Sequence, residues 1–222
     1  MRHFLKTTEG KAVTFVVAVI VLLFAYYFYA MNKNGGTQTS EPTITQGDHV
    51  RGNLSGTVTL VEFGDIQCPA CGAYEPIVRQ VTADNAQVLK VVFKHFPLTQ
   101  IHQNALLAAR ASEAAANQGK FWEMHDIMYD NQTEWATAIN VSDLINGYAE
   151  KIGLKMDQFK TDIASDAILQ KITADYKEGV GLGVQGTPTF FVNGKKIDNP
   201  ASVEAFDQII RDAAKESQTT TQ

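Results

Sequence analysis

The feature that most constrains this sequence is a pair of cysteines, Cys68 and Cys71, which are the only two in 222 residues. They enclose Pro69 and Ala70 in the tetrapeptide CPAC. A disulfide between them closes a ring so short that it removes little entropy from the unfolded chain, which gives it little value as a structural cross-link. A pair at this spacing is suited to opening and closing in redox exchange.

The residues on either side of the pair predict a strand, a turn and a helix. Residues 58–63 are apolar and β-branched, which is typical of a buried strand. Residues 73–82 repeat apolar side chains at helical spacing, and Pro69 suits the first helical position, which needs no N–H donor. Cys68 is therefore expected at a helix N-terminus, where the helix dipole stabilises a thiolate and lowers the thiol pKa to roughly 3.5–7.5.

This placement predicts different roles for the two sulfurs. Cys68 is expected to attack or to be attacked, and Cys71, one turn further on and more buried, to resolve the mixed disulfide. A structural disulfide, two inert buried thiols and a zinc site are the alternatives. A zinc site needs about four Cys or His ligands. The sequence has no second cysteine pair and no H-x₃₋₅-H spacing among its five histidines, so we expect no metal.

Residues 12–32 contain no charged side chain, and a helix of that length matches a bilayer core of about 30 Å. Basic residues precede the run, so residues 1–11 are expected in the cytoplasm and the rest of the chain outside it, where disulfides persist. A cleaved signal peptide is the alternative. Its apolar region covers only about 7–15 residues before a small-x-small site, whereas this run ends in the bulky Tyr27-Phe28-Tyr29-Ala30-Met31. We therefore expect an uncleaved, single-pass membrane anchor.

The rest of the chain is expected to hold one domain, over residues 56–215. Residues 33–55 are rich in Gly, Thr, Ser, Asn and Gln, which is typical of a flexible spacer, and residues 216–222 are expected to be a disordered tail. The net charge is −5, although basic residues gather near the N-terminus. The acidic remainder argues against nucleic acid as a partner.

Within this domain, the order of elements predicts an α/β fold with a mixed central sheet and helices on both faces. A second strand over residues 88–93 completes a β-α-β unit. The Asn193-Gly194 dipeptide lies between two short β-prone runs and predicts a hairpin, which a helix over 202–215 follows. A helical block fills about residues 99–182, and its expected helices cover 104–117, 120–129, 141–152, 157–163 and 167–178.

Four segments together resemble the thioredoxin superfamily, and more closely its DsbA-like branch: VEFGDIQCPAC, FKHFPL, AARASEAAANQGKFWEMHD and GVQGTPTFFVNGK. The resemblance covers about residues 48–215 and implies a thioredoxin-like fold with a helical insertion. It also implies a thiol–disulfide oxidoreductase that introduces disulfides into secreted or surface proteins. Such an enzyme needs no cofactor and is reoxidised by a quinone-linked membrane partner. We expect a monomer.

Two further positions take their roles from this resemblance. Thr187-Pro188 matches the cis-proline that presents backbone beside the cysteine pair to an extended client segment; without the resemblance, a trans bond is the default. Glu62 matches a buried acid that passes a proton to the second cysteine. Its position on a strand covered on both faces also predicts desolvation and a raised pKa, although a side chain reaching the end of the sheet is the alternative.

The resemblance leaves the direction of electron flow open. Ala70 stands where strongly oxidising DsbA proteins commonly have a histidine that stabilises the neighbouring thiolate, so a weaker oxidant is expected. A reductase or isomerase and a redox-inactive, chaperone-like binding module are the alternatives. His95 and His102 are expected to be surface or packing residues, and Trp122 and Trp135 to line the core or a groove. For Asp65 and Gln67, tuning of Cys68 and formation of the turn before it are both open.

Overall fold

The computed structural model describes residues 8–33 and 41–219, and the chain divides into two compact units, Met1–Gln38 and Thr39–Gln222. In the first unit, helix α1 (Thr8–Lys33) contains the uncharged run. Among the residues described, no helix is both long enough and apolar enough to cross a membrane. The anchor expected over residues 12–32 stays a prediction, and residues 1–7 of the expected cytoplasmic segment lie outside the described ranges.

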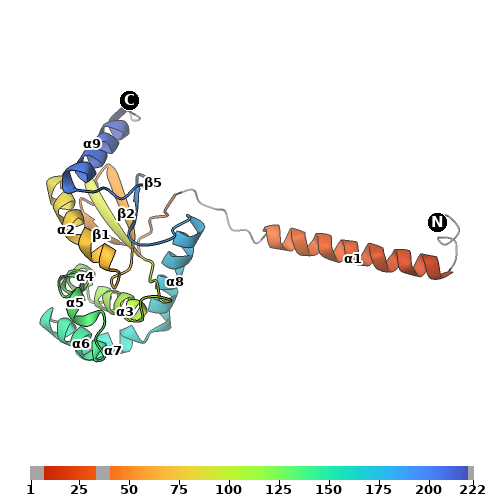
Figure 1. Ribbon diagram of the computed structural model, residues 1–222, viewed down its shortest axis with the longest axis horizontal. Helices are drawn as coiled ribbons and strands as arrows, with labels where there is room; N and C mark the ends of the chain where they lie inside the picture. Colours follow the sequence, from red (N-terminus) through yellow and green to blue (C-terminus); the bar gives the residue numbers. More distant parts are fainter. Residues whose placement is uncertain (1–7, 34–40, 220–222) are drawn as a thin grey trace. The chain divides into compact units, whose positions relative to one another are not determined.

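The second unit is built on a five-stranded sheet in the order β1-β3-β2-β4-β5 (Figure 1). β2 and β3 run parallel, and the other neighbours pair antiparallel. The predicted mixed sheet is confirmed. Its strands are β1 (His49–Gly52), β2 (Val58–Gly64), β3 (Leu89–His95), β4 (Thr189–Val192) and β5 (Lys195–Ile197).

The hairpin between β4 and β5 turns at the predicted Asn-Gly dipeptide. Asn193 has a φ of 46° and Gly194 a φ of 81°. Both lie in the left-handed region that a two-residue type I′ turn requires, which Asn and Gly tolerate better than other residues.

Strand β1 corrects the expectation of a flexible spacer over residues 33–55 for residues 49–52, whereas residues 34–40 of that range lie outside the described residues. His49 to Gly52 pair with Phe93 to Lys90 of β3 and form an edge of the sheet. The four residues HVRG are too short and too polar to show a strand pattern on their own. Their order comes from contacts with residues far along the chain, which local composition does not reveal.

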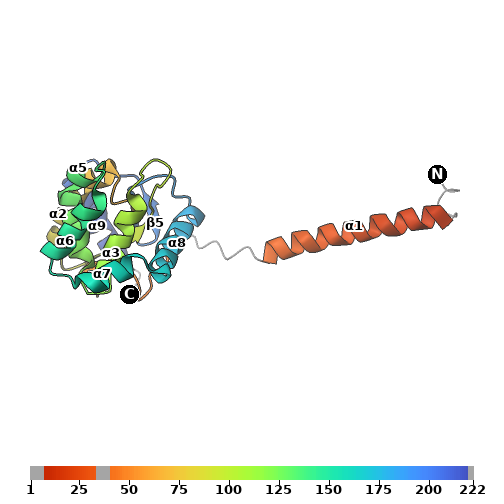
Figure 2. The same ribbon diagram turned by 90° about the horizontal axis from the view of Figure 1, so that it is seen from below.

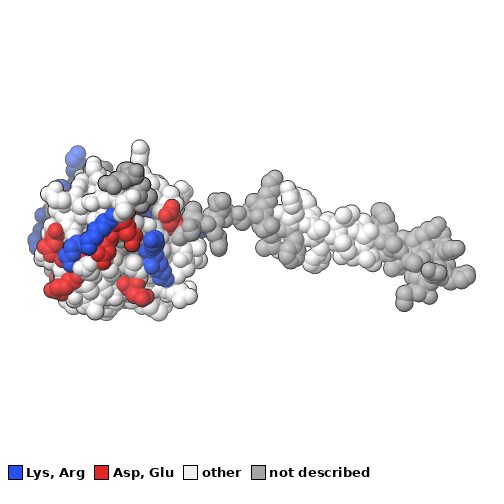
Figure 3. Space-filling model, turned by 90° about the horizontal axis from the view of Figure 1, so that it is seen from above, with Lys and Arg blue, Asp and Glu red and all other residues white. Residues whose placement is uncertain are grey.

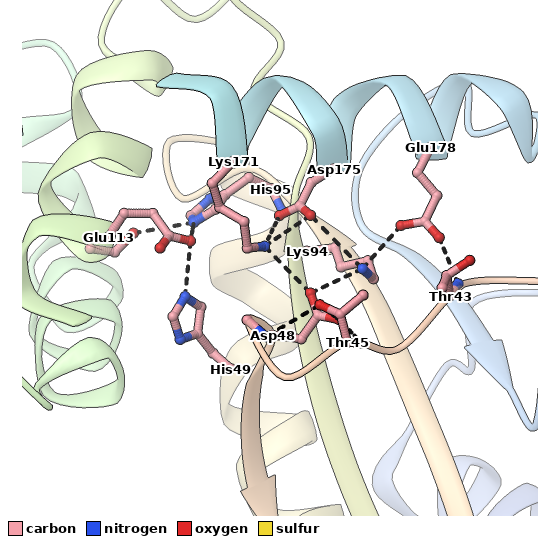
Figure 4. Close-up of polar contacts among 12 residues, drawn as sticks. Thr43, Thr45, Asp48, His49, Lys94, His95, Glu113, Lys171, Asp175 and Glu178 are labelled. Atoms are coloured by element: carbon pink, nitrogen blue, oxygen red, sulfur yellow. Dashed lines mark hydrogen bonds and ion pairs between the residues drawn. The ribbon is translucent and has the colours of Figure 1, made fainter. Parts of the chain in front are cut away.

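A buried ion-pair cluster holds the segment before β1 in place, and Figure 4 shows its side chains converging from three elements. We call this group, Asp48, Lys94, Lys171, Asp175 and Glu178, the clasp. The Lys94 ammonium lies 3.0 Å from both Asp48 and Glu178 carboxylates, and Lys171 lies 2.7 Å from Asp175. The clasp therefore links the start of the domain to β3 and to helix α8 (Asp166–Gly181).

Helices cover both faces of the sheet, as predicted. On one face, α2 (Pro69–Asp84) and α9 (Val203–Thr219) pack over Leu60 of β2, with Phe206 of α9 in the same apolar core. On the other face, α8 lies against Phe63 and Phe96. A Cβ at Gly179 of α8 would come within 2.7 Å of the Phe96 ring, so this close approach requires glycine.

Helix α9 is longer than predicted, because it ends at Thr219. The tail expected over residues 216–222 is therefore helical in its first four residues. The Thr219 hydroxyl donates to the Lys215 carbonyl, 2.8 Å away, which continues the side-chain contacts of the last turn. Residues 220–222 lie outside the described ranges.

The helical insertion is confirmed and forms a core of its own beside the sheet (Figures 1 and 2). The largest side chain in this core is Trp135, which is fully buried and donates from Nε1 to the Met128 carbonyl at 2.7 Å. Phe93 of β3 and both cysteines belong to the same core. Before α8, the helices are α3 (Ala105–Ala116), α4 (Phe121–Asp130), α5 (Gln132–Trp135), α6 (Val141–Lys151) and α7 (Met156–Ile163).

Charges of both signs are interspersed on the face of the folded unit drawn in Figure 3. Basic and acidic side chains lie next to one another there, which matches the modest net charge of the sequence. That face of the described residues presents no broad basic area of the kind that attracts polyanions.

Candidate redox site

Cys68 is the N-cap residue of α2, as predicted. Its φ of −67° and ψ of 123° are extended, and Pro69 occupies the first helical position. The Cys68 carbonyl accepts the first helical hydrogen bond from the Gly72 N–H at 3.1 Å. Cys71 is fully buried, Cys68 is 7% exposed, and both are thiols in this structure. Pro69 and Ala70 are exposed between them.

The surroundings of Cys68 lower its thiol pKa to about 5. The largest cause is a hydrogen bond from the Cys71 thiol. Backbone N–H groups of Ala70 and Cys71 and the Thr187 side chain also stabilise the thiolate, while burial opposes them. A thiol with this pKa is almost fully ionised at neutral pH, and a stabilised thiolate is the form that attacks and leaves in thiol–disulfide exchange.

Cys71 and Glu62 have the opposite character. Burial is the main cause that raises the pKa of the Cys71 thiol, and the charges of Glu62 and Cys68 raise it further. Glu62 is 3% exposed on β2, and burial together with the nearby Glu75 carboxylate raises its pKa well above the ordinary value. Glu62 therefore does not reach solvent at the end of the sheet. A carboxyl group whose pKa is raised in this way can donate a proton to a nearby sulfur and, once ionised, can accept one.

The Thr187–Pro188 peptide bond is cis, as the resemblance implied. The Cys68 thiol donates to the Thr187 carbonyl oxygen at 3.4 Å, so this backbone lies directly beside the reactive sulfur. The Thr187 hydroxyl oxygen is buried and has no hydrogen-bond partner in this dithiol form. It is placed to donate when the sulfur carries a charge. Pro188 is buried, and its carbonyl accepts from Asn199 at 3.0 Å.

Asp65 organises the turn between β2 and Cys68. Its Oδ1 accepts from the Gln67 N–H at 2.8 Å, and its Oδ2 accepts from the Leu98 N–H at 2.9 Å and lies 2.7 Å from the His102 ring. A side-chain carboxylate that binds the N–H two residues on is a common turn stabiliser. His102 therefore supports the turn rather than the sulfur, and Asp65 ties the turn to the loop after β3.

Two amide side chains, those of Gln132 and Gln67, join the turn to the helical insertion. Gln132 of α5 donates from Nε2 to the Ile66 and Cys68 carbonyls, at 2.7 and 3.0 Å. Gln67 donates to the Ala136 carbonyl at 2.6 Å and accepts from the Asn104 N–H at 2.7 Å. Gln132 and Asn104 were missed because they come from distant elements, and no local pattern marks such residues.

A second buried charged cluster lies on the Glu62 side of α2. Glu75 accepts from Arg79 at 2.8 Å and lies 3.4 Å from Arg51, which also binds Asp126 at 2.6 Å. Glu75, His125 and Asp126 are close enough to share a metal ion. The two arginines already neutralise the carboxylates, so these residues fit an ion-pair network better than a cation site.

The remaining predicted residues have packing roles. His95 is 1% exposed, and its ring lies 3.1 Å from Glu113. Trp122 donates from Nε1 to the Val50 carbonyl at 3.1 Å, and the Arg51 guanidinium lies 4.1 Å from its ring centre. Both side chains therefore support the sheet and the insertion, as the sequence predicted.

Comparisons with known proteins agree with this geometry. A family model described as thioredoxin matches residues 44–212. The crystal structure of oxidised BdbD from Bacillus subtilis superimposes with a TM-score of 0.69 and 26% identity, covering 79% of this chain and 96% of that one. The α-DsbA1 protein of Wolbachia pipientis has a TM-score of 0.69 at 21% identity over 81% and 96% of the two chains, which shows the shared fold.

Curated relatives are longer proteins. A protein of Salinispora tropica named Na(+)/H(+) antiporter NhaA 3 is 41% identical over 172 residues, which are 78% of this chain and 26% of that protein. A protein of Mycolicibacterium vanbaalenii named Na(+)/H(+) antiporter NhaA 1 is 38% identical over 169 residues, again 26% of its length. The chain thus spans about a quarter of each of these relatives.

Proposed function

This chain belongs to the thioredoxin family, and from that premise we propose that it is an extracytoplasmic thiol–disulfide oxidoreductase that introduces disulfides into secreted or surface proteins. The site carries the chemistry of thiol–disulfide exchange in Cys68 and Cys71, and neither thiol needs a cofactor for it. Transport is not proposed, because the relatives named as antiporters match this chain over only 26% of their length.

The observation that carries the proposal is the contrast between the two sulfurs. Cys68 has a pKa lowered to about 5, whereas the Cys71 pKa is raised by burial. A stabilised Cys68 thiolate favours the reduced enzyme, and an enzyme whose reduced form is stabilised is a stronger oxidant of other thiols. This asymmetry therefore favours donation of a disulfide over reduction of one.

The first chemical step is attack on the oxidised pair. A client thiolate attacks Cys68 Sγ, the Cys68–Cys71 bond breaks, and the bonding electrons leave with Cys71. Cys71 takes up a proton, for which Glu62 is the nearby buried carboxyl. The Thr187 backbone, beside Cys68, would pair with the extended client segment.

The second step releases the client. A second client thiolate attacks the client sulfur of the mixed disulfide and expels Cys68 as a thiolate, which its low pKa makes a good leaving group. The client has then lost two electrons and gained a disulfide, and the enzyme holds two thiols. A quinone-linked membrane partner would reoxidise the pair, with the enzyme held at the membrane through residues 12–32.

The experiment is a client-oxidation assay with the oxidised full chain, solubilised in mild detergent, and a reduced, unfolded protein that contains several cysteines. We expect stoichiometric oxidation of the client and loss of activity in Cys68→Ser. Cys71→Ser, which cannot form the internal disulfide, should instead trap mixed disulfides when its Cys68 thiolate attacks a client that already contains disulfides. Separation of cytoplasmic, membrane and extracytoplasmic fractions tests the location.

Two outcomes would replace the proposal. Faster reduction of an oxidised client than oxidation of a reduced one would indicate a reductase, consistent with Ala70 in place of histidine. Full cellular function of Cys68→Ala would indicate a binding module that does not use the thiols.

A further inference from the structure

Gln132 makes hydrogen bonds to the backbone around Cys68 that have no role in the reaction outlined above. Its single amide nitrogen donates to two carbonyls that flank Gln67, those of Ile66 at 2.7 Å and Cys68 at 3.0 Å. The Cys68 carbonyl also accepts the first helical bond of α2. One side chain from the insertion therefore fixes the backbone on both sides of the turn that presents the reactive cysteine.

The helical turn that carries Gln132 is held in place by its own contacts. Gln132 begins α5, and its own carbonyl accepts from the Ala136 N–H at 3.0 Å. Trp135, in the same turn of helix, is fully buried and hydrogen-bonded to Met128. The position of the Gln132 amide, and with it the turn before Cys68, therefore depends on the packing of the insertion core.

The facing surface of α2 is shaped to admit this amide. A Cβ added at Gly72 would clash with the Gln132 Oε1 and lie 3.0 Å from its Cδ. Glycine is less favourable than alanine inside a helix, so its presence at this position needs another reason. A glycine in the first turns of α2 therefore keeps the space in which Gln132 reaches the Cys68 carbonyl.

We propose that Gln132 is a positioning residue for Cys68: its amide holds the Ile66 and Cys68 carbonyls so that the sulfur faces the free N–H groups at the start of α2. The proposal rests on the thiol–disulfide exchange proposed above. Without the amide, the turn can rotate and the alignment with the Ala70 and Cys71 N–H groups loosens. The thiolate is then less stabilised, and the pair becomes a weaker oxidant.

The test measures two properties of the full chain in detergent: the pH titration of Cys68 by thiolate absorbance, and the equilibrium constant with glutathione. Gln132→Ala and Gln132→Met are compared, because Met keeps most of the side-chain volume without the N–H donors. In both variants we expect the Cys68 titration to move to higher pH. We expect the glutathione equilibrium to shift about three- to tenfold toward the protein disulfide.

Gln118→Ala is the matched control. Gln118 also joins two backbone groups across a loop, donating to the Lys155 carbonyl at 3.2 Å and accepting from its N–H at 2.8 Å, but it belongs to the α3–α4 connection. This variant should leave the Cys68 titration and the glutathione equilibrium unchanged, while it lowers the melting temperature about as much as Gln132→Ala does.

A Gly72→Ala variant provides a second, independent perturbation of the same contact. It should shift the glutathione equilibrium in the same direction as Gln132→Ala, and the double variant should not exceed the larger single effect. Wild-type values for Gln132→Met, or equal shifts in Gln118→Ala, would overturn the assignment. Failure of the wild-type chain to oxidise a client would instead contradict the proposed function, and the two failures are therefore distinct.

Discussion

At Cys68, acidity depends on one donor more than on any other group, because the hydrogen bond from the Cys71 thiol is the largest cause of the lowered pKa. The helix N-terminus and Thr187 add smaller contributions. The sequence predicted a lowered pKa from the helix position alone. It could not rank the donors, because the ranking depends on how the sulfurs and the Thr187 loop approach one another in three dimensions.

Titration of the reduced protein should show one thiolate forming near pH 5, with Cys71 protonated through neutral pH. Cys71→Ala should raise the Cys68 pKa, whereas Cys71→Ser, which keeps a hydroxyl donor, should raise it less. The readout is thiolate absorbance against pH. Equal titrations of the two variants would contradict a hydrogen bond as the main cause.

The same shift has a consequence for stability. Because the folded-state pKa of Cys68 is depressed, its contribution to the stability of the reduced form is fully present above the unfolded thiol pKa of about 8.5 and is lost as pH falls through about 5. Lowering the pH from 8 to 4 should therefore destabilise the reduced form more than the oxidised form, which has no thiol to titrate. Melting temperatures of the two forms over this pH range check the difference.

Glu62→Gln should change activity and stability in opposite directions. Loss of the proton donor should slow the step in which Cys71 leaves and takes up a proton by at least about tenfold, measured as slower formation of the mixed disulfide from the oxidised enzyme. The raised pKa of Glu62 means that its stability contribution is present at low pH and lost as pH rises through the folded-state pKa. The Gln variant should therefore gain thermal stability over the wild type at high pH.

Glu123→Gln is the control for this variant, since Glu123 lies exposed on α4 and pairs with Lys120 at 2.8 Å. It should match the wild type in both measurements. Slow exchange without a gain in stability would show that Glu62 is needed for structure rather than for proton transfer.

Among the elements, those with a long local period were predictable and those fixed by distant partners were not. The helices of the insertion and the Asn193-Gly194 hairpin carry their signals within a few residues. Strand β1 and the one-turn helix α5 do not, because four residues are too few to show a period. The cis bond before Pro188 came only from the family resemblance, since sequence context alone favours trans.

The clasp should dominate the stability of β1 and α8. Lys94→Ala removes a cation that is itself 3% exposed and leaves the buried Asp48 carboxylate with only Lys171, 3.4 Å away, so the expected loss is up to about 3–5 kcal/mol. Lys195→Ala removes an exposed ion pair with Glu216 and should cost no more than about 1 kcal/mol. Denaturant unfolding of the two variants compares them directly, and equal losses would contradict a structural role for the clasp.

For the whole molecule, the domain starts earlier than composition indicated. The compact unit begins at Thr39, and β1 and Asp48 precede the expected start at residue 56. A fragment of residues 39–222 should unfold in one cooperative transition. A fragment of residues 56–222 loses an edge strand and leaves Lys94 without Asp48, so it should melt at a clearly lower temperature or fail to fold. Equal melting temperatures would mean that β1 is dispensable.

The measurement that tests the central claim most directly is the reduction potential of the Cys68–Cys71 pair, obtained by glutathione equilibration of the compact unit, residues 39–222. A pair built to donate disulfides should have a potential of about −120 to −180 mV, well above the glutathione poise, because the Cys68 thiolate is stabilised. A potential near about −270 mV, in the thioredoxin range, would contradict the oxidant assignment and make the protein a reductase.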